Sequence, residues 1–405
     1  LKTQVLGNPH SANPTSLAMT EMVEETREHV LEYFNASPEE YIAVFTMNAS
    51  NALKLVGESY PFAPDGRYLL TFDNHNSVNG IREFARSKGA DFTYVPLTTP
   101  DLRIDKPALD KLLASASPKQ HNLFAFPAQS NFSGVKHPLA LVTQAQSLGW
   151  DVCLDAAAFV PTSRLDLSEV KPEFVTMSFY KMFGYPTGLG ALLMRKSVLG
   201  KLHRPWFAGG TVNFASVQAR GHYLAPNEAA FEDGTVNYLN IPAIKIGLVH
   251  LQKVGMATIG ERVRCLTGWL IDQLMGLAHE NGRPMIRLYG PDNTKMRGGT
   301  ITLNFYDPDG HLLDYRRIEE LANEQGISLR TGCFCNPGAG EMAEGLTRED
   351  MLAGLAESED MTLPRFMQLI QHRGNKSAGA IRISVGLATN FADVYHFMQF
   401  ASSFR

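Results

Sequence analysis

The sequence predicts an α/β protein with a mostly parallel seven-stranded sheet between helices, followed by a smaller α+β unit. From about residue 41 to 200, short apolar runs alternate with segments whose apolar residues recur every three or four positions. After about residue 245 this alternation gives way to one long helical pattern and a few strands. The chain has 405 residues, 44% hydrophobic and 19% charged, which suits a globular protein of two or three domains.

Seven runs in the first part have the length and composition of buried strands. In chain order they are residues 41–46, 68–72, 92–95, 122–126, 152–155, 174–177 and 190–194. Helical spacing lies between several of them, most clearly over 49–60 and 139–148. Strands that alternate with helices form parallel sheets, and such sheets bind ligands at the carboxyl ends of their strands.

The second part predicts a smaller α+β domain. Its elements are a long helical stretch over 246–281, a strand over 299–305, a helix over 315–325 and a strand over 380–384. We expect a large domain over residues 15–245 and a small domain over 246–405. Residues 1–14 are assigned to the small domain, although they could pack against either.

Charge and cysteine content narrow the class of protein. The 37 basic and 41 acidic side chains give a net charge of −4, which argues against nucleic acid as a partner. No apolar run approaches the roughly 18 residues that span a bilayer, so no membrane partner is expected. The start of the chain has neither a signal-peptide pattern nor a methionine, so we expect it to be cropped. Four cysteines are too few for a disulfide framework and suit a reducing, cytoplasmic location. No metal site is expected, because Cys333 and Cys335 are too close for a C-x-x-C pattern.

One glycine-containing segment, Ser178-Phe-Tyr-Lys181-Met-Phe-Gly184, follows the sixth strand. A lysine at a strand end, among turn-forming residues, is placed to project into a cleft and attack an aldehyde. Taken alone, a lysine in such a loop is more often an ordinary surface residue. The segment therefore needs support from elsewhere in the chain.

Asp155 supplies that support at the end of the preceding strand. A carboxylate after a buried strand needs a partner, because burying an unpaired charge is costly. A protonated pyridine nitrogen is one such partner. In a cofactor that contains a pyridine ring, this positive charge keeps the ring an electron sink. The other interpretation, an Asp that caps the next helix, is equally compatible with this residue alone.

Together with Thr235 in Phe231-Glu-Asp-Gly-Thr235, these residues resemble the class V, fold-type I pyridoxal-phosphate enzymes. Within that group, the chain is similar to the N-terminal, cysteine-desulfurase-like domain of molybdenum cofactor sulfurases. The motifs that carry the resemblance are Gly7-Asn-Pro-His-Ser11, Asp73-Asn-His-Asn-Ser-Val78, Gly80-Ile-Arg-Glu83, the Lys181 segment and Leu329-Arg-Thr-Gly-Cys-Phe-Cys-Asn-Pro-Gly-Ala339. The resemblance runs from residue 7 to about residue 400.

The resemblance implies pyridoxal 5'-phosphate as the cofactor, with Lys181 joined to it as a Schiff base and Asp155 paired to its pyridine nitrogen. His75 would stack on the ring and is a second candidate for proton transfer. The phosphate would be held by the backbone of Ala49 and by the hydroxyls of Ser50 and Ser178. Ala49 and Ser50 follow a strand-to-helix turn, where free N–H groups and the helix dipole favour an anion. Without the resemblance, Ser50 would be an ordinary N-cap and His75 a surface-loop residue.

Three further positions are assigned by the same resemblance. Asn131 would approach the phenolic oxygen of the cofactor or the substrate, and Arg382 would bind the substrate α-carboxylate with its two-pronged guanidinium. Thr235 would reach the phosphate of a neighbouring subunit, which implies a homodimer with active sites at the interface. From pattern alone, Asn131 and Thr235 are turn residues and Arg382 is an outward-facing arginine on an alternating strand.

Cys335 is the residue on which the predicted reaction depends. In desulfurases a loop cysteine attacks the sulfur of the bound substrate and becomes a persulfide, and the attacking thiolate needs an exposed, electropositive setting. Gly332, Pro337, Gly338 and Gly340 give this segment the composition of a mobile loop. Cys335 is favoured over Cys333 because it aligns with the persulfide cysteine of the family.

The predicted activity is therefore a cysteine desulfurase of the sulfurase type, which takes sulfur from L-cysteine or a derivative and passes it to a sulfur acceptor. Three departures keep alternatives open. Ala158 stands where many desulfurases have Gln, Tyr180 stands where many have His, and the sequence ends before the C-terminal domain of full sulfurases. The alternatives are a stand-alone class V lyase, epimerase or aminotransferase, and a scaffold or sulfur-carrier partner without cofactor activity.

Overall fold

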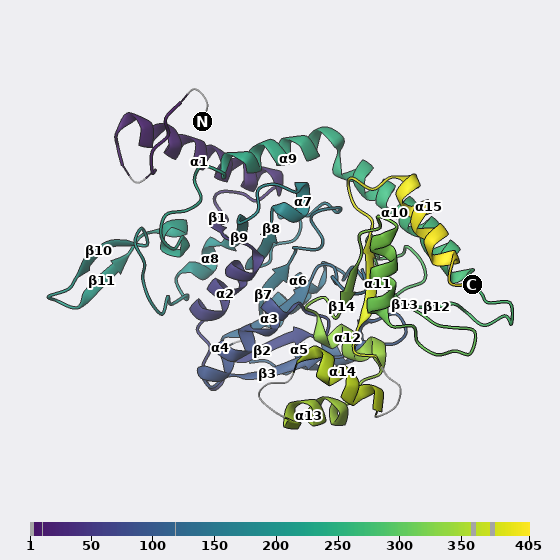
Figure 1. The fold of residues 1–405 in the computed structure, drawn as a ribbon. Coiled ribbons are helices and arrows are strands. Elements are labelled where there is room, and N and C mark those ends of the chain that lie inside the picture. The colour runs from purple at the N-terminus through teal and green to yellow at the C-terminus, as the bar shows by residue number, and fades with distance from the viewer. Residues whose placement is uncertain (1–3, 10, 118, 358–361, 373–376) are drawn as a thin grey trace.

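The computed structural model describes residues 4–9, 11–117, 119–357, 362–372 and 377–405. Its centre is a seven-stranded sheet (Figure 1). In spatial order its strands are β1 (Tyr41–Thr46), β9 (Gly190–Arg195), β8 (Phe174–Ser178), β7 (Asp151–Asp155), β6 (Asn122–Pro127), β2 (Arg67–Thr71) and β3 (Asp91–Val95). Every pair from β8 to β3 is parallel, and only β9 runs antiparallel to its two neighbours. The seven predicted strands and the mostly parallel sheet are confirmed.

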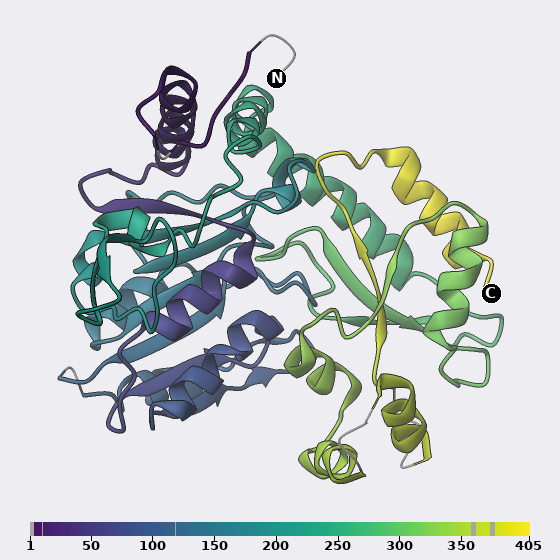
Figure 2. The same ribbon diagram turned by 60° about the vertical axis from the view of Figure 1, so that its left-hand side comes forward.

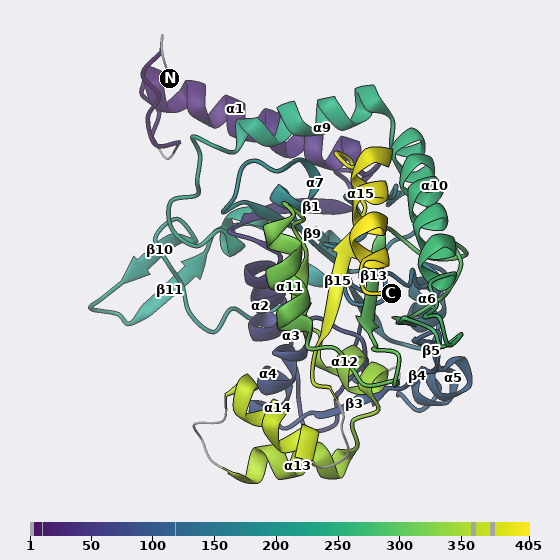
Figure 3. The same cartoon turned by 45° about the vertical axis from the view of Figure 1, so that its right-hand side comes forward.

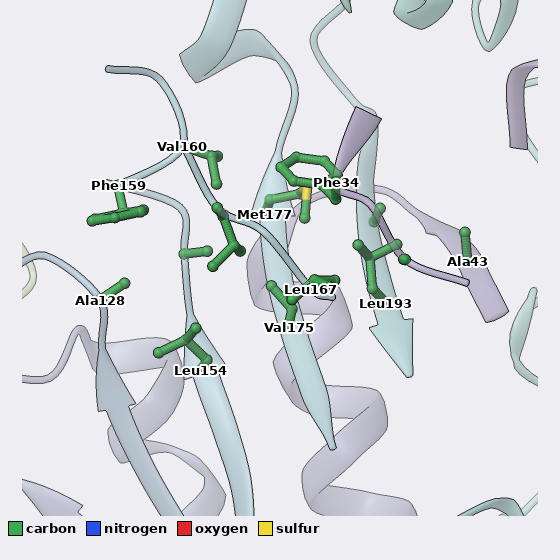
Figure 4. Packing of buried hydrophobic residues seen from close by; sticks show 14 of the residues in the cluster. Phe34, Ala43, Ala128, Leu154, Phe159, Val160, Leu167, Val175, Met177 and Leu193 are labelled. Carbon is green, nitrogen blue, oxygen red and sulfur yellow. The ribbon is translucent and has the colours of Figure 1, made fainter. Parts of the chain in front are cut away.

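Helices cover both faces of this sheet because successive strand residues point to opposite sides. On one face, Leu154, Val175 and Met177 pack with residues of α1 (Pro14–Tyr33), α6 (Leu141–Ser147) and α9 (Pro242–Val254). Figure 4 shows part of this cluster, with Leu167 and Phe34 close to the strand side chains. On the other face, the intervening residues, such as Cys153, pack with α2 (Ala49–Ser59) and α4 (Ile81–Ser87).

A smaller sheet forms the second unit (Figure 2). Its antiparallel strands lie in the order β12 (Ile286–Tyr289), β13 (Thr300–Phe305), β15 (Ala380–Ser384) and β14 (Arg330–Gly332). The helices α10 (Met256–Met275), α11 (Tyr315–Glu324) and α15 (Phe391–Ser402) pack on one face of it (Figure 3). The opposite face is turned to the large unit, where the Thr302 hydroxyl donates to the Phe132 carbonyl at 2.6 Å.

The remaining elements are short or lie at the periphery. They are α3 (Asn76–Asn79), β4 (Leu97–Thr98), β5 (Arg103–Ile104), α5 (Lys106–Leu113), α7 (Tyr180–Phe183), α8 (Lys196–Leu199), a 3₁₀ helix over Asn227–Phe231, α12 (Pro337–Glu344), α13 (Arg348–Glu357) and α14 (Leu363–His372). A hairpin of β10 (Val212–Ser216) and β11 (Gly221–Leu224) projects from the body in Figure 1. Its residues are mostly exposed, so it lacks the burial pattern that would have predicted it.

Two details of the second part differ from the sequence prediction. The helical stretch over 246–281 is two helices, because Gly255 adopts a left-handed backbone (φ +88°) between α9 and α10. The boundary expected at residue 245 falls inside α9, whose Ile244, Leu248 and Leu251 belong to the core of the large sheet. Leu6 also packs against that core, not against the small sheet. The division into two domains stays a prediction, with these segments on the side of the large unit.

Among the described residues, none of the helices combines the length and the apolar character that crossing a membrane requires.

Candidate active site

A cavity of about 290 Å³ opens where β6, β7 and β8 end. The last residue of each of these strands, Pro127, Asp155 and Ser178, lines it. The other lining residues are Asn48, Ala49, Ser50, Leu53, His75, Ser77, Gln129, Asn131, Ala157, Ala158, Tyr180 and Lys181. The structure thus brings together seven of the residues selected from the sequence, at the edge of the sheet where parallel strands present ligand sites.

Lys181 and Asp155 both line this cavity, and neither forms an ion pair with a residue that the structure describes. Lys181 lies in α7, where buried Phe179 and Met182 anchor the segment while the lysine itself is exposed. Its amine forms no hydrogen bond or ion pair within the part of the chain that the structure describes. Asp155 is buried, and one carboxylate oxygen accepts the Ala157 N–H at 3.0 Å. No described residue forms an ion pair with Asp155, so a cation is still needed at this carboxylate.

The N-terminus of α2 forms the polar end of the cavity. Asn48 caps the helix by accepting the Asn51 N–H at 2.9 Å, and the Ala49 N–H donates to the Ser178 hydroxyl at 2.9 Å. The hydroxyls of Ser50 and Ser77 are 2.5 Å apart. A helix N-terminus ringed by three hydroxyls is a suitable site for a phosphate. Ser77 was not selected from the sequence, although it lies inside the motif that contains His75.

His75 is held by the backbone that follows it. Its Nδ1 accepts the Ser77 N–H at 3.1 Å, so a neutral ring carries its proton on Nε2. Burial lowers the pKa of His75, an effect that the nearby Asp155 carboxylate opposes and that Lys181 and Arg382 reinforce. The ring therefore favours the neutral form near neutral pH.

The lowered pKa of His75 gives a testable acid-side effect on stability. The unfolded chain binds this proton more readily than the folded chain, so the contribution is fully present above the ordinary pKa of 6.5 and is lost as the pH falls below it. In cofactor-free protein, His75→Gln should flatten the fall in melting temperature below about pH 6.5. An NMR titration should also place the His75 midpoint below that value. A midpoint above it would contradict the assignment.

Arg382 lies on the face of β15 that is turned to the large unit. Its guanidinium donates to the Asn131 carbonyl at 3.0 Å and lies 4.7 Å from the centre of the Phe334 ring. Burial and the neighbouring Arg330 lower the pKa of Arg382, and the charge of Cys335 partly offsets this. The structure places Arg382 beside the cavity through Asn131 rather than on the outside of the strand.

Cys335 is exposed, as expected, and it lies in a tight turn between β14 and α12. Phe334 and Cys335 both have left-handed backbones (φ +55° and +56°), and the Cys335 carbonyl accepts the Asn76 N–H at 2.7 Å. Asn336 caps α12, and its side chain also donates to the Asp73 carbonyl at 2.7 Å. The Asn-Pro pair at 336–337 is itself a helix-start signal, which the glycine-based prediction overlooked.

The turn also fits closely against the segment that holds His75. A Cβ atom on Gly338, in the first turn of α12, would lie 1.9 Å from the Phe72 carbonyl oxygen, so only glycine allows this approach. The Asn131 side chain donates to the Phe334 carbonyl at 2.8 Å and completes the anchoring. Cys333 is half-buried, whereas Cys335 is exposed.

Thr235, like Arg382 and Cys335, does not line this cavity. It lines a second cavity of about 670 Å³ together with Lys54, Trp206 and Asp233, and Asn48 lines both cavities. The role assigned to it by resemblance lies in a neighbouring subunit, so its place in this single chain does not test that role.

The residues present fit pyridoxal phosphate. The cavity presents a lysine and a carboxylate that form no ion pair with any described residue, and a helix N-terminus with hydroxyls. These are the groups needed by an aldehyde, a pyridine nitrogen and a phosphate. The fold and this site define a pyridoxal-phosphate enzyme of fold type I.

The comparisons agree with that class. The sequence model of the "Aminotransferase class-V" family matches residues 2–397, and the chain belongs to this family. The predicted family, fold class and cofactor are confirmed, and pyridoxal phosphate is the cofactor.

Among curated proteins, the chain is similar to molybdenum cofactor sulfurases. It is 37% identical to that of Arabidopsis thaliana over 99% of this chain and 53% of the relative. It is 34% identical to that of Homo sapiens over 99% of this chain and 46% of the relative. The chain thus spans about half the length of the curated relatives it matches.

Solved structures of low sequence identity share the fold. A cysteine desulfurase from Thermococcus onnurineus NA1 has a TM-score of 0.79 at 21% identity, covering 99% of this chain and 88% of that one. The cysteine desulfurase CsdA from Escherichia coli has a TM-score of 0.74 at 20% identity, covering 98% and 86%.

Proposed function

We propose that the protein is an L-cysteine desulfurase that moves sulfur from the substrate to Cys335. One observation carries the proposal: an exposed cysteine is held in a turn whose backbone is hydrogen-bonded to the segment of His75, beside a cavity suited to pyridoxal phosphate. The similarity to molybdenum cofactor sulfurases and the shared fold with cysteine desulfurases support the same conclusion.

Arg382 and Asn131 are the residues proposed to bind the substrate. The Arg382 guanidinium still has a buried Nε without a hydrogen-bond partner among the described residues, so it has donor capacity for a carboxylate. Its contact with the Asn131 backbone directs it toward the cavity. We expect the α-carboxylate to lie between these two residues and the α-carbon to lie near Lys181.

Lys181 and His75 have different capacities for proton transfer. Bound pyridoxal phosphate supplies an electron sink for negative charge at the α-carbon. Because Nδ1 of His75 accepts the Ser77 N–H, the neutral ring presents Nε2–H, which is a donor. This geometry favours Lys181 as the base that takes the α-proton and His75 as the group that can return a proton.

The sulfur step then balances without an oxidant. The Cys335 thiolate bonds to the substrate sulfur, the carbon–sulfur bond breaks, and its electron pair stays on carbon. That carbon takes a proton and alanine leaves, while Cys335 holds the sulfur as a persulfide. Arg382 is a cation that interacts electrostatically with the Cys335 side chain.

The proposal is tested by product analysis with the cofactor-loaded protein. Incubation with L-cysteine should yield alanine and protein-bound persulfide, in equal amounts over the first turnover. L-Cystine, a cysteine conjugate and L-alanine serve as comparison substrates in the same assay. Pyruvate and ammonia in place of alanine, or turnover of the conjugate with little turnover of free cysteine, would instead indicate a lyase that uses the same scaffold.

We further propose a homodimer and a cytoplasmic location. Thr235 and Trp206 line the second cavity, which shares Asn48 with the active-site cavity, and Trp206, Phe214 and Tyr223 are exposed, which supports contact with a second copy. Sedimentation should give about twice the mass of one chain.

All four cysteines have free thiols, which supports a reducing compartment. A persulfide on exposed Cys335 would be open to a sulfur acceptor.

A further inference from the structure

A buried carboxylate–imidazole pair lies close in the chain to residues that line the active-site cavity. The Asp73 carboxylate contacts His137 Nε2 at 2.8 Å, and the two side chains are 0% and 2% exposed. Neither residue lines the cavity. Asp73 lies two residues before His75, and His137 follows the loop that carries Asn131, so the pair joins two segments of the site.

The Asp73 carboxylate depends on His137, because no other described side chain bonds to it. Among the described residues, His137 is the only side chain that bonds to this carboxylate, and the second oxygen, Oδ1, has no hydrogen-bond partner. A buried carboxylate that loses its partner is strongly unfavourable. Without His137, the segment of Asp73 should therefore shift toward water.

His137 is fixed to the sheet. Its backbone N–H donates to the Ala128 carbonyl at 3.0 Å, directly after β6, and its ring lies at the edge of Phe126. Gln129 and Lys136 form a β-bridge that closes the intervening loop. The imidazole thus holds Asp73 at a set position relative to the carboxyl end of β6.

The segment held by Asp73 contacts both reacting parts of the site. The Asp73 carbonyl accepts from the Asn336 side chain at 2.7 Å, and the Asn76 N–H donates to the Cys335 carbonyl at 2.7 Å. His75 lies between these two contacts. A shift of this segment would change the placement of the His75 ring and of the Cys335 turn together.

We propose that Asp73 and His137 are a positioning pair that fixes the distance between His75 and Cys335 for sulfur transfer. The proposal rests on the proposed function for its catalytic consequence, while its structural consequence holds for the cofactor-free protein. Because Nε2 of the His137 imidazole makes the contact with Asp73, the test variants are chosen to keep or to lose a nitrogen at that position.

Two substitutions separate this role from general stability. Gln places its amide nitrogen as many bonds from Cβ as Nε2 of His, whereas Asn places it one bond nearer, at the position of Nδ1. His137→Gln should therefore keep the contact with Asp73, and His137→Asn should lose it. The first readout is the rate at which iodoacetamide alkylates Cys335 in cofactor-free protein, with exposed Cys265 on α10 as the internal reference. The second is alanine formation from L-cysteine by the loaded enzyme.

We expect His137→Asn to lower alanine formation by about 10- to 100-fold, the cost of a misplaced reacting group. The Cys335 alkylation rate should change at least about threefold relative to Cys265, because the turn loses its anchor. His137→Gln should keep both values within about threefold of the parent protein. If His137→Asn does not fold, Asp73→Asn/His137→Asn removes the buried charge and should show the same change in alkylation.

The opposite pattern would overturn the proposal. Equal alkylation ratios in the parent protein, His137→Asn and the double variant would show that the pair does not position Cys335. Equal losses in the Gln and Asn variants, in proportion to their melting temperatures, would show a purely structural role. If the parent protein forms no alanine, the proposed function fails, and the alkylation readout still decides the role of the pair.

Discussion

Lys181→Ala should abolish retention of pyridoxal phosphate through desalting and lower alanine formation by about 10²–10⁴-fold or more. The lysine amine is the nucleophile that joins the cofactor aldehyde, and in our proposal it also takes the α-proton. Alanine at this position has neither capacity. Visible absorbance of the desalted protein and release of alanine from L-cysteine measure the two effects.

The same variant should have little effect on the stability of the protein. Lys181 is exposed and makes no hydrogen bond or ion pair among the described residues, so the cofactor-free variant should melt within a few degrees of the parent protein. Lys196→Ala is a matched control, because Lys196 is also exposed on a four-residue helix that follows a strand, but it lies outside the cavity. Equal cofactor retention in both variants would contradict the assignment of Lys181.

Cys335→Ala should eliminate the protein-bound persulfide and reduce alanine formation by at least about 10- to 100-fold. The side chain is exposed and the turn is held by backbone groups that alanine keeps, so the active-site geometry should survive. Intact-mass analysis after incubation with L-cysteine should show one added sulfur atom on the parent protein and none on the variant.

Cys333→Ala is the control for Cys335. Cys333 is two residues away in the same turn and is only half-buried, so it is also reachable by reagents. We expect its replacement to leave the persulfide in place. Undiminished alanine formation in Cys335→Ala would show that sulfur leaves the substrate without this cysteine. Loss of the persulfide in Cys333→Ala alone would move the nucleophile to that residue.

The large sheet could be predicted from the sequence because its strands are buried. Its seven strands were found because buried strands consist of apolar runs bounded by turn residues, and this pattern is local. The strands that were not predicted include the β10–β11 hairpin, β14 and the four-residue β12. The hairpin is mostly exposed and β14 has three residues, so neither leaves an apolar pattern in the sequence.

The selected residues at strand ends line one cavity in the structure. Asp155 ends a predicted strand and Ser178 directly follows one, and parallel strands bring their carboxyl ends together. The helix that begins at Pro337 was not predicted, because the glycines and the proline of this segment were read as the composition of a loop. Ser77 and the Asp73–His137 pair were not selected from the sequence. Ser77 meets Ser50, and Asp73 meets His137, only in the folded chain, so no local pattern shows either contact.

The sequence alone thus determined the family and the cofactor, through motifs that resemble those of class V pyridoxal-phosphate enzymes. Only the tertiary structure decided how the second unit meets the first. It placed Arg382 against Asn131, fixed Cys335 against Asn76 and buried Asp73 beside His137. Each of these contacts joins segments far apart in the chain. The first two depend on the packing of one unit against the other and the third on the packing of loops within the large unit, and no local pattern specifies either.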